Sequence, residues 1–173
     1  MNYKLALLLI ALTGCDVATA TNINVPTEET QNMFRKINDK ISVSPQISLD
    51  DVTAAKAEGV TLIINNRPDG EDPSAPQSAD IEAAAHEAGM KYIAIPITHS
   101  GFSGPQVDAM IAALADGDKT LAYCRSGTRS TLLWSLAQAK QGVDPDEISR
   151  LAGNAGYDIT PVRAMVDALA AGN

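Results

Sequence analysis

The chain of 173 residues has the length of one domain, which is long enough to bury a core of its own. It is acidic, with a formal net charge of −8, and aromatic residues make up only 4% of it. These values exclude nucleic acid and an anionic membrane surface as expected partners, because both attract a basic protein surface. The acidic charge and the low aromatic content instead favour a small substrate that binds at one confined site.

The N-terminus is typical of an exported bacterial protein. An apolar run over residues 5–12 follows Lys4 and is too short to span a bilayer, as in a signal peptide. The next residues, up to Gly14-Cys15, resemble the lipobox, where a lipoprotein precursor is cut before the cysteine that receives the lipid. We therefore expect a signal peptide over residues 1–14, lipidation at Cys15 and a polar tether over 15–32.

This leader predicts export, with a lipid anchor at the periplasmic face of a bacterial membrane and no other membrane contact. Two alternatives remain open. Cleavage at the small residues 17–20 would give a soluble periplasmic protein, and an uncleaved leader would stay as a structural segment. If Cys15 is lipidated or removed, Cys124 is the single thiol of the mature chain, because the sequence has only 2 cysteines.

The folded domain is expected over residues 33–173. Apolar runs and turn signals predict four strands, over 37–43, 60–66, 91–97 and 119–123. Four helices are predicted over 48–58, 78–88, 103–115 and 129–140, and two more begin near Asp144 and Thr160. This alternation predicts an α/β fold with a doubly wound, mainly parallel sheet.

Ligands of such a sheet bind beyond the carboxyl ends of its strands. The loops at that edge, which carry the unusual residues of the chain, are 66–77, 98–103 and 124–130.

The loop that begins at Cys124 has the design of a thiolate site. It follows an apolar strand and precedes a helix, whose N-terminus favours a negative charge. Gly127 lets successive backbone N–H groups converge on one anion, and Arg125 and Arg129 add positive charge. Ser126, Thr128 and Ser130 are further hydrogen-bond donors for the sulfur or for a bound anion. We expect Cys124 to be a nucleophile rather than a buried core cysteine.

The loop resembles two families of cysteine enzymes. Rhodanese-type sulfurtransferases have the spacing Cys-Arg-x-Gly-x-Arg, which this chain matches with four residues between Cys124 and Arg129. Protein tyrosine and dual-specificity phosphatases have five, and Ser130 and Tyr123 stand where those enzymes carry their arginine and histidine. The resemblance to both families implies that Ser130 helps the thiolate to leave.

Beyond the loop, segments at 63–71, 92–97 and 155–158 resemble the phosphatase-like domain of the beta-lactamase hydrolase-like proteins, also described as sulfur transferases. This resemblance extends from residue 37 to the C-terminus. It implies a protein-tyrosine-phosphatase-like fold with the nucleophile loop at a strand-to-helix turn.

Three residues of the other loops are candidates for a supporting role. Arg67 is expected to hold a loop carboxylate or a substrate anion, and Asp69 and His99 are candidate proton donors. Plain turn chemistry is the alternative for Arg67 and Asp69, and a solvated side chain is the alternative for His99. No His, Cys and carboxylate spacing suits a metal, so neither a metal nor a cofactor is expected.

The preferred functional hypothesis is a sulfurtransferase that carries sulfane sulfur as a Cys124 persulfide. It needs no general acid, which suits a 98–103 loop without Asp. The alternative is a dual-specificity-like phosphatase that forms a cysteinyl-phosphate. A thiol redox sensor or an anion-binding lipoprotein is a third possibility. The expected partner is a small anionic or sulfur-donor substrate.

Overall fold

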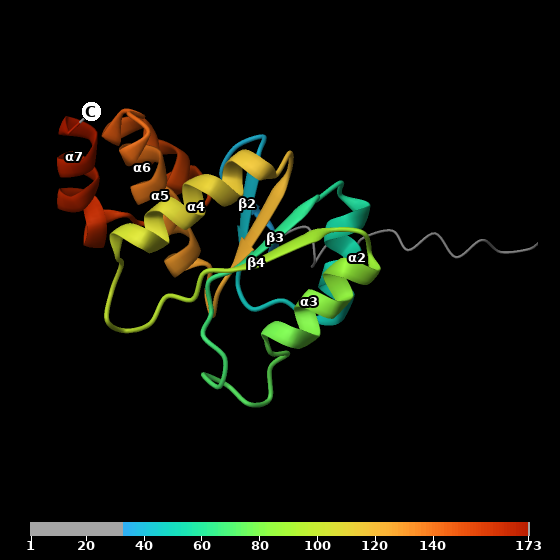
Figure 1. Ribbon diagram of the computed structural model, residues 1–173. Coiled ribbons are helices and arrows are strands. Elements are labelled where there is room, and N and C mark those ends of the chain that lie inside the picture. The colour runs from blue at the N-terminus through green and yellow to red at the C-terminus, as the bar shows by residue number, and fades with distance from the viewer. Residues whose placement is uncertain (1–32, 173) are drawn as a thin grey trace, which may run out of the picture.

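A five-stranded sheet runs through the computed structural model, which describes residues 33–172 (Figure 1). Its order is β1-β2-β5-β3-β4, with β1 at Arg35–Lys36, β2 at Ile41–Ser44, β3 at Leu62–Asn65, β4 at Lys91–Ala94 and β5 at Thr120–Tyr123. Strands β2, β5, β3 and β4 are parallel to one another, and β1 is antiparallel to β2. The predicted doubly wound, mainly parallel sheet is confirmed.

The first predicted strand differs in detail. A single strand was expected over 37–43, whereas the structure has the short hairpin of β1 and β2. Asn38 causes the turn, because its side-chain oxygen accepts hydrogen bonds from the backbone N–H of Lys40 (2.9 Å) and Ile41 (3.0 Å). This turn adds an antiparallel edge to the sheet.

Helices cover both faces of the sheet (Figure 1). One face packs against α2 (Leu49–Ala57) and α3 (Ser78–Glu87). The core on the other face lies under α4 (Gly104–Asp116) and α5 (Thr128–Lys140). Helices α6 (Pro145–Asn154) and α7 (Arg163–Ala171) pack in turn on α5, and the short 3-10 helix η1 (Thr160–Val162) precedes α7. No helix within residues 33–172 is both long and apolar enough to cross a membrane.

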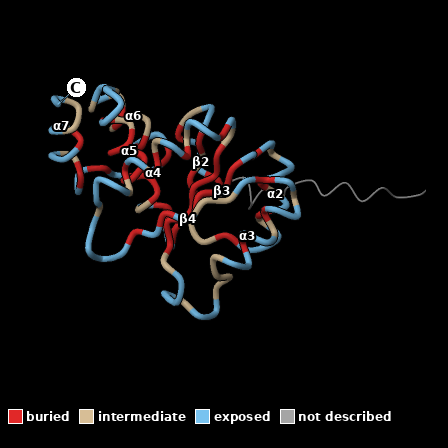
Figure 2. Tube along the Cα trace, viewed as in Figure 1, coloured by how far each residue is buried: buried red, intermediate tan, exposed pale blue. Residues whose placement is uncertain are grey.

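The central strands are buried on both faces (Figure 2). Leu62 and Ile64 of β3 belong to the core under α4 to α7, and Ile63 between them belongs to the core under α2 and α3. Such a strand has consecutive apolar side chains that point to both faces, as expected for a parallel sheet covered on both sides. Its carboxyl end therefore has a fixed place in the domain.

Helix α5 lies in the middle of the larger core. Most of its side chains are buried, among them Leu133, Trp134 and Leu136, and its neighbours are α4, α6 and α7. It begins directly after the loop that follows β5. The nucleophile loop is thus fixed between a buried strand and a buried helix.

Candidate active site

The loop of residues 124–127 holds Cys124 at the carboxyl end of β5. Cys124 is fully buried, and its Sγ accepts a hydrogen bond from the backbone N–H of Gly127 at 3.2 Å. Gly127 has a φ of +86°, a conformation that favours glycine, and it is the cap residue before α5. The sulfur therefore lies close to a helix N-terminus and receives a backbone hydrogen bond, two features that stabilise a thiolate.

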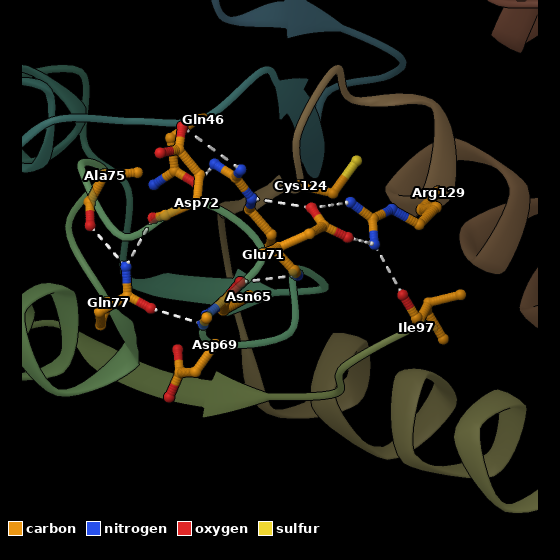
Figure 3. A network of polar contacts seen from close by, with 12 residues as sticks. Gln46, Asn65, Asp69, Glu71, Asp72, Ala75, Gln77, Ile97, Cys124 and Arg129 are labelled. Carbon is orange, nitrogen blue, oxygen red and sulfur yellow. Dashed lines mark hydrogen bonds and ion pairs between the residues drawn. The ribbon is translucent and has the colours of Figure 1, made fainter. Parts of the chain in front are cut away.

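Arg129, in the first turn of α5, is held in a defined orientation (Figure 3). Its Nη1 and Nη2 donate to Glu71 Oε1 and Oε2 at 2.7 and 2.8 Å, and Nη1 also donates to the Ile97 carbonyl at 2.7 Å. These contacts engage three of the five N–H groups of the guanidinium. The other two, on Nε and Nη2, share one edge, which is the geometry that binds two oxygens of an anion.

Glu71 is the carboxylate on which this arrangement depends. Hydrogen bonds from Arg129, and after them those from Arg67, lower the pKa of Glu71 to about 2 although partial burial opposes the shift. The hydrogen bond to Glu71 is the largest of the causes that raise the pKa of Arg129; burial opposes the shift, and the neighbouring Cys124 adds to it. Glu71 is thus ionised and Arg129 is charged beside the sulfur.

Arg67 ties the neighbouring loops into the same network. It is buried, with 8% of its surface exposed, and its Nε donates to Glu71 Oε2 at 2.9 Å. Its Nη1 donates to Gln46 Oε1 at 2.8 Å, and its Nη2 lies 3.7 Å from Asp72 Oδ2. The prediction that Arg67 holds a loop carboxylate matches these contacts. Together with Arg129, it connects the segments that follow β2, β3, β4 and β5.

Neither candidate proton donor takes part in the side-chain hydrogen bonds of Arg129 and Arg67. Asp69 Oδ1 accepts a hydrogen bond from the backbone N–H of Ser78 at 2.8 Å, at the start of α3. His99 is exposed in the loop after β4. Within residues 33–172, neither side chain is hydrogen-bonded to Cys124 or Arg129. The turn role considered for Asp69 is the one that its contact fits.

The remaining predicted loop residues have differing surroundings. Arg125, Ser126 and Thr128 are exposed, and Ser126 Oγ donates to Thr128 Oγ1 at 3.1 Å. Ser130 is fully buried, and its Oγ has no hydrogen-bond partner among residues 33–172. The predicted lipidation site Cys15, the signal peptide 1–14 and the tether 15–32 lie outside the described residues.

Three residues near the loop escaped the sequence reasoning. The sequence offers a clue to Glu71, since it follows Arg67 by four positions in a long polar loop. No sequence pattern indicates that Gln46 contacts Arg67. Tyr157, whose hydroxyl donates to the Ser126 carbonyl at 3.2 Å, lies in the 155–158 segment noted for its resemblance only. Among the described residues, no three His, Cys, Asp or Glu side chains gather as metal ligands would.

The fold, with a cysteine loop between a central strand and a buried helix, is of the protein-tyrosine-phosphatase-like class. The structure is similar to a candidate phosphatase from Neisseria meningitidis Z2491, with a TM-score of 0.70 and 31% identity over 80% of this chain and 98% of that one. Tk-PTP in its active form shares the fold, with a TM-score of 0.62 and 15% identity over 80% and 97% of the two chains.

The chain belongs to the family of the phosphatase-like domain of beta-lactamase hydrolase-like proteins, whose model matches residues 33–141. The beta-lactamase hydrolase-like protein of Xylella fastidiosa Temecula1 is 32% identical over 125 residues. This match covers 71% of the present chain and 29% of that protein, so the chain spans less than a third of the relative.

Proposed function

We propose that the domain is a cysteine-dependent phosphatase that hydrolyses phosphate monoesters. The observation that carries this proposal is the orientation of Arg129, which Glu71 and the Ile97 carbonyl fix while its second two-pronged edge, used by neither of them, lies beside Cys124. A planar edge of this kind suits two oxygens of a phosphoryl group. The family and the phosphatase-like structural neighbours support the same conclusion.

In this mechanism the Cys124 thiolate attacks phosphorus, the ester P–O bond breaks and the leaving group departs with the bonding electrons as an alkoxide or phenoxide, which takes a proton from water. Arg129 and the backbone N–H groups of the loop stabilise the charge on the phosphoryl oxygens. Water then attacks the cysteinyl-phosphate, the P–S bond breaks, and inorganic phosphate and the Cys124 thiolate are released. Phosphoryl transfer needs this kind of positioning and charge stabilisation more than any other contribution.

A sulfurtransferase is the second candidate, and the four-residue spacing between Cys124 and Arg129 favours it. The thiolate would attack the outer sulfur of thiosulfate, the S–S bond would break, and sulfite would leave with its electron pair. The resulting persulfide would pass its terminal sulfur to cyanide or to a thiol and so regenerate the thiolate. The Gly127 N–H at 3.2 Å from Sγ suits such an anion.

We also propose that the chain is exported and anchored to the periplasmic face of a membrane by a lipid on Cys15. The motif at residues 12–15 supports this. Globomycin, which blocks the lipoprotein signal peptidase, should cause a larger precursor to accumulate. A precursor that is processed equally in the presence of the inhibitor would contradict the proposal.

The deciding experiment compares the full chain with Cys124→Ser in two assays, hydrolysis of aryl phosphates and transfer of sulfur from thiosulfate to cyanide. We expect hydrolysis by the wild type and a loss of about a thousandfold or more in the variant, because a hydroxyl is a far weaker nucleophile than a thiolate. Sulfur transfer without hydrolysis would replace the first proposal with the second. Full activity of Cys124→Ser would overturn both.

A further inference from the structure

The peptide between Ser126 and Gly127 is held on both sides. Its N–H donates to Cys124 Sγ at 3.2 Å, and its carbonyl accepts a hydrogen bond from the Tyr157 hydroxyl, also at 3.2 Å. The C=O and N–H of a trans peptide point in opposite directions, so Tyr157 and Cys124 contact opposite ends of one amide group. Rotation of this amide would break both hydrogen bonds at once.

Tyr157 also fills the space beside Gly127. A Cβ built on Gly127 would lie 2.0 Å from Tyr157 Oη and 2.7 Å from its Cζ, which is far inside contact distance. The ring therefore takes the place of a side chain at this position. The ring thus packs closely against the residue whose N–H contacts the sulfur.

Tyr157 is itself held firmly. Only 8% of its surface is exposed, and the guanidinium of Arg35 in β1 lies 5.2 Å from the centre of its ring, a cation–π distance. Burial raises the pKa of Tyr157, so the hydroxyl keeps the proton that it donates. Tyr157 lies in the segment after α6, beyond the residues 33–141 that match the family model.

We propose that Tyr157 is a positioning residue of the nucleophile loop, which orients the Ser126–Gly127 amide and makes its N–H a stronger donor to the Cys124 sulfur. A carbonyl that accepts a hydrogen bond polarises its amide, and the N–H of that amide then donates more strongly. The inference rests on the proposed role of Cys124 as the nucleophile. It deepens that role, because the C-terminal part of the domain then tunes the reactive thiolate.

The test is the rate at which iodoacetamide alkylates Cys124 in the full chain, followed by mass spectrometry of the peptide that contains Cys124, so that Cys15 does not contribute. Tyr157→Phe removes the hydroxyl and keeps the ring. Tyr92→Phe is the matched control, because it also removes one hydrogen-bonded tyrosine hydroxyl: that hydroxyl accepts a hydrogen bond from Asn65 Nδ2 at 2.9 Å, and the side chain packs against the core under α2 and α3.

We expect Tyr157→Phe to slow alkylation near neutral pH about fivefold, the effect of one lost hydrogen bond, and to move the pH profile of alkylation upward. Tyr92→Phe should stay close to wild type. In turnover assays, kcat of Tyr157→Phe should fall while KM changes little, because Arg129 still binds the substrate anion. Arg35→Met, which frees the ring but keeps the hydroxyl, should slow alkylation less.

Equal alkylation rates in wild type and Tyr157→Phe would overturn the inference. If Tyr157→Phe melts well below wild type, Arg35→Met decides instead, and an unchanged rate in that variant would count against a role for Tyr157. Alkylation needs no turnover. A chain that hydrolyses no ester and transfers no sulfur would therefore overturn the proposed function, while slower alkylation of Tyr157→Phe would still support the positioning role.

Discussion

Glu71 and Arg129 are 58 residues apart in the chain, yet their side chains form a two-pronged ion pair with N–O distances of 2.7 and 2.8 Å. Such fork-to-fork pairs fix the plane of the guanidinium as well as its position. The same carboxylate accepts a hydrogen bond from Arg67, behind it, at 2.9 Å. The loop after β3 therefore sets the direction in which Arg129 faces the nucleophile.

Glu71→Gln should lower kcat/KM for aryl phosphates by about tenfold or more, because a carboxamide offers one acceptor oxygen and turns its NH₂ group toward an arginine donor. Glu147→Gln is the matched control. Glu147 forms a similar two-pronged pair with Arg150, at 2.8 and 2.7 Å, on the exposed side of α6. Equal effects of the two substitutions would mean that the Glu71 pair does not orient Arg129.

The stability of the domain should depend on the charge of Glu71 at low pH. Hydrogen bonds from Arg129 and Arg67 hold the pKa of Glu71 at about 2 in the folded chain, below its ordinary value of 4.5. A depressed pKa contributes stability that is fully present above pH 4.5 and is lost as the pH falls toward 2.

The free energy of unfolding, measured with urea, should therefore differ more between wild type and Glu71→Gln near pH 6 than near pH 3. A difference of the same size at both pH values would show that the ionised carboxylate does not stabilise the fold.

Much of this site could be predicted because its parts are local in the sequence. The strand before Cys124, the turn glycine Gly127 and the following helix lie within a few residues of each other, so composition and spacing indicate the thiolate loop. The partners of Arg129 are different. They depend on the strand order, which places β5 between β2 and β3, and no local pattern contains that order. Asp69 and Glu71 looked alike as loop carboxylates, and only the packed loop shows that one caps α3 and the other holds Arg129.

Arg129→Lys should reduce kcat/KM far more than Arg125→Lys. Lysine keeps the positive charge but has one nitrogen, so it cannot contact Glu71, the Ile97 carbonyl and a phosphoryl group in the same way. Arg125 is exposed, and its charge alone should matter. We expect a loss of about a hundredfold for Arg129→Lys and only a few-fold for Arg125→Lys in steady-state kinetics. Similar small losses would indicate that charge rather than geometry binds the anion.

Gly127→Ala should destabilise the domain more than Gly142→Ala. Both glycines have a similar positive φ, +86° and +82°, so alanine meets a backbone cost of about 1 kcal/mol at either position. At Gly142 nothing lies within 4 Å of the added Cβ, whereas at Gly127 the Cβ would lie 2.0 Å from Tyr157 Oη. Each substitution lowers the free energy of unfolding by some amount, and the difference between the two amounts therefore isolates the contact with Tyr157. Equal values would mean that Tyr157 moves aside without cost.

Hydrolysis should be fast only for esters whose alcohol leaves without a proton. Asp69 is engaged with the Ser78 backbone at 2.8 Å, and His99 is an exposed loop side chain. We therefore expect kcat/KM to fall steeply as the pKa of the leaving phenol rises, because neither group is placed to protonate it. A series of substituted phenyl phosphates measures this slope directly.

Asp69→Asn and His99→Gln test whether either residue is a proton donor by changing the protein instead of the substrate. Loss of the carboxylate that holds the start of α3 should lower kcat/KM for every ester by the same small factor and should leave the slope unchanged. His99→Gln should leave both the rates and the slope close to those of the wild type. A proton donor behaves differently, because its removal slows esters of poor leaving groups and spares those of good ones. A slope that steepens in only one of the two variants would identify that residue as the acid and would contradict the expectation.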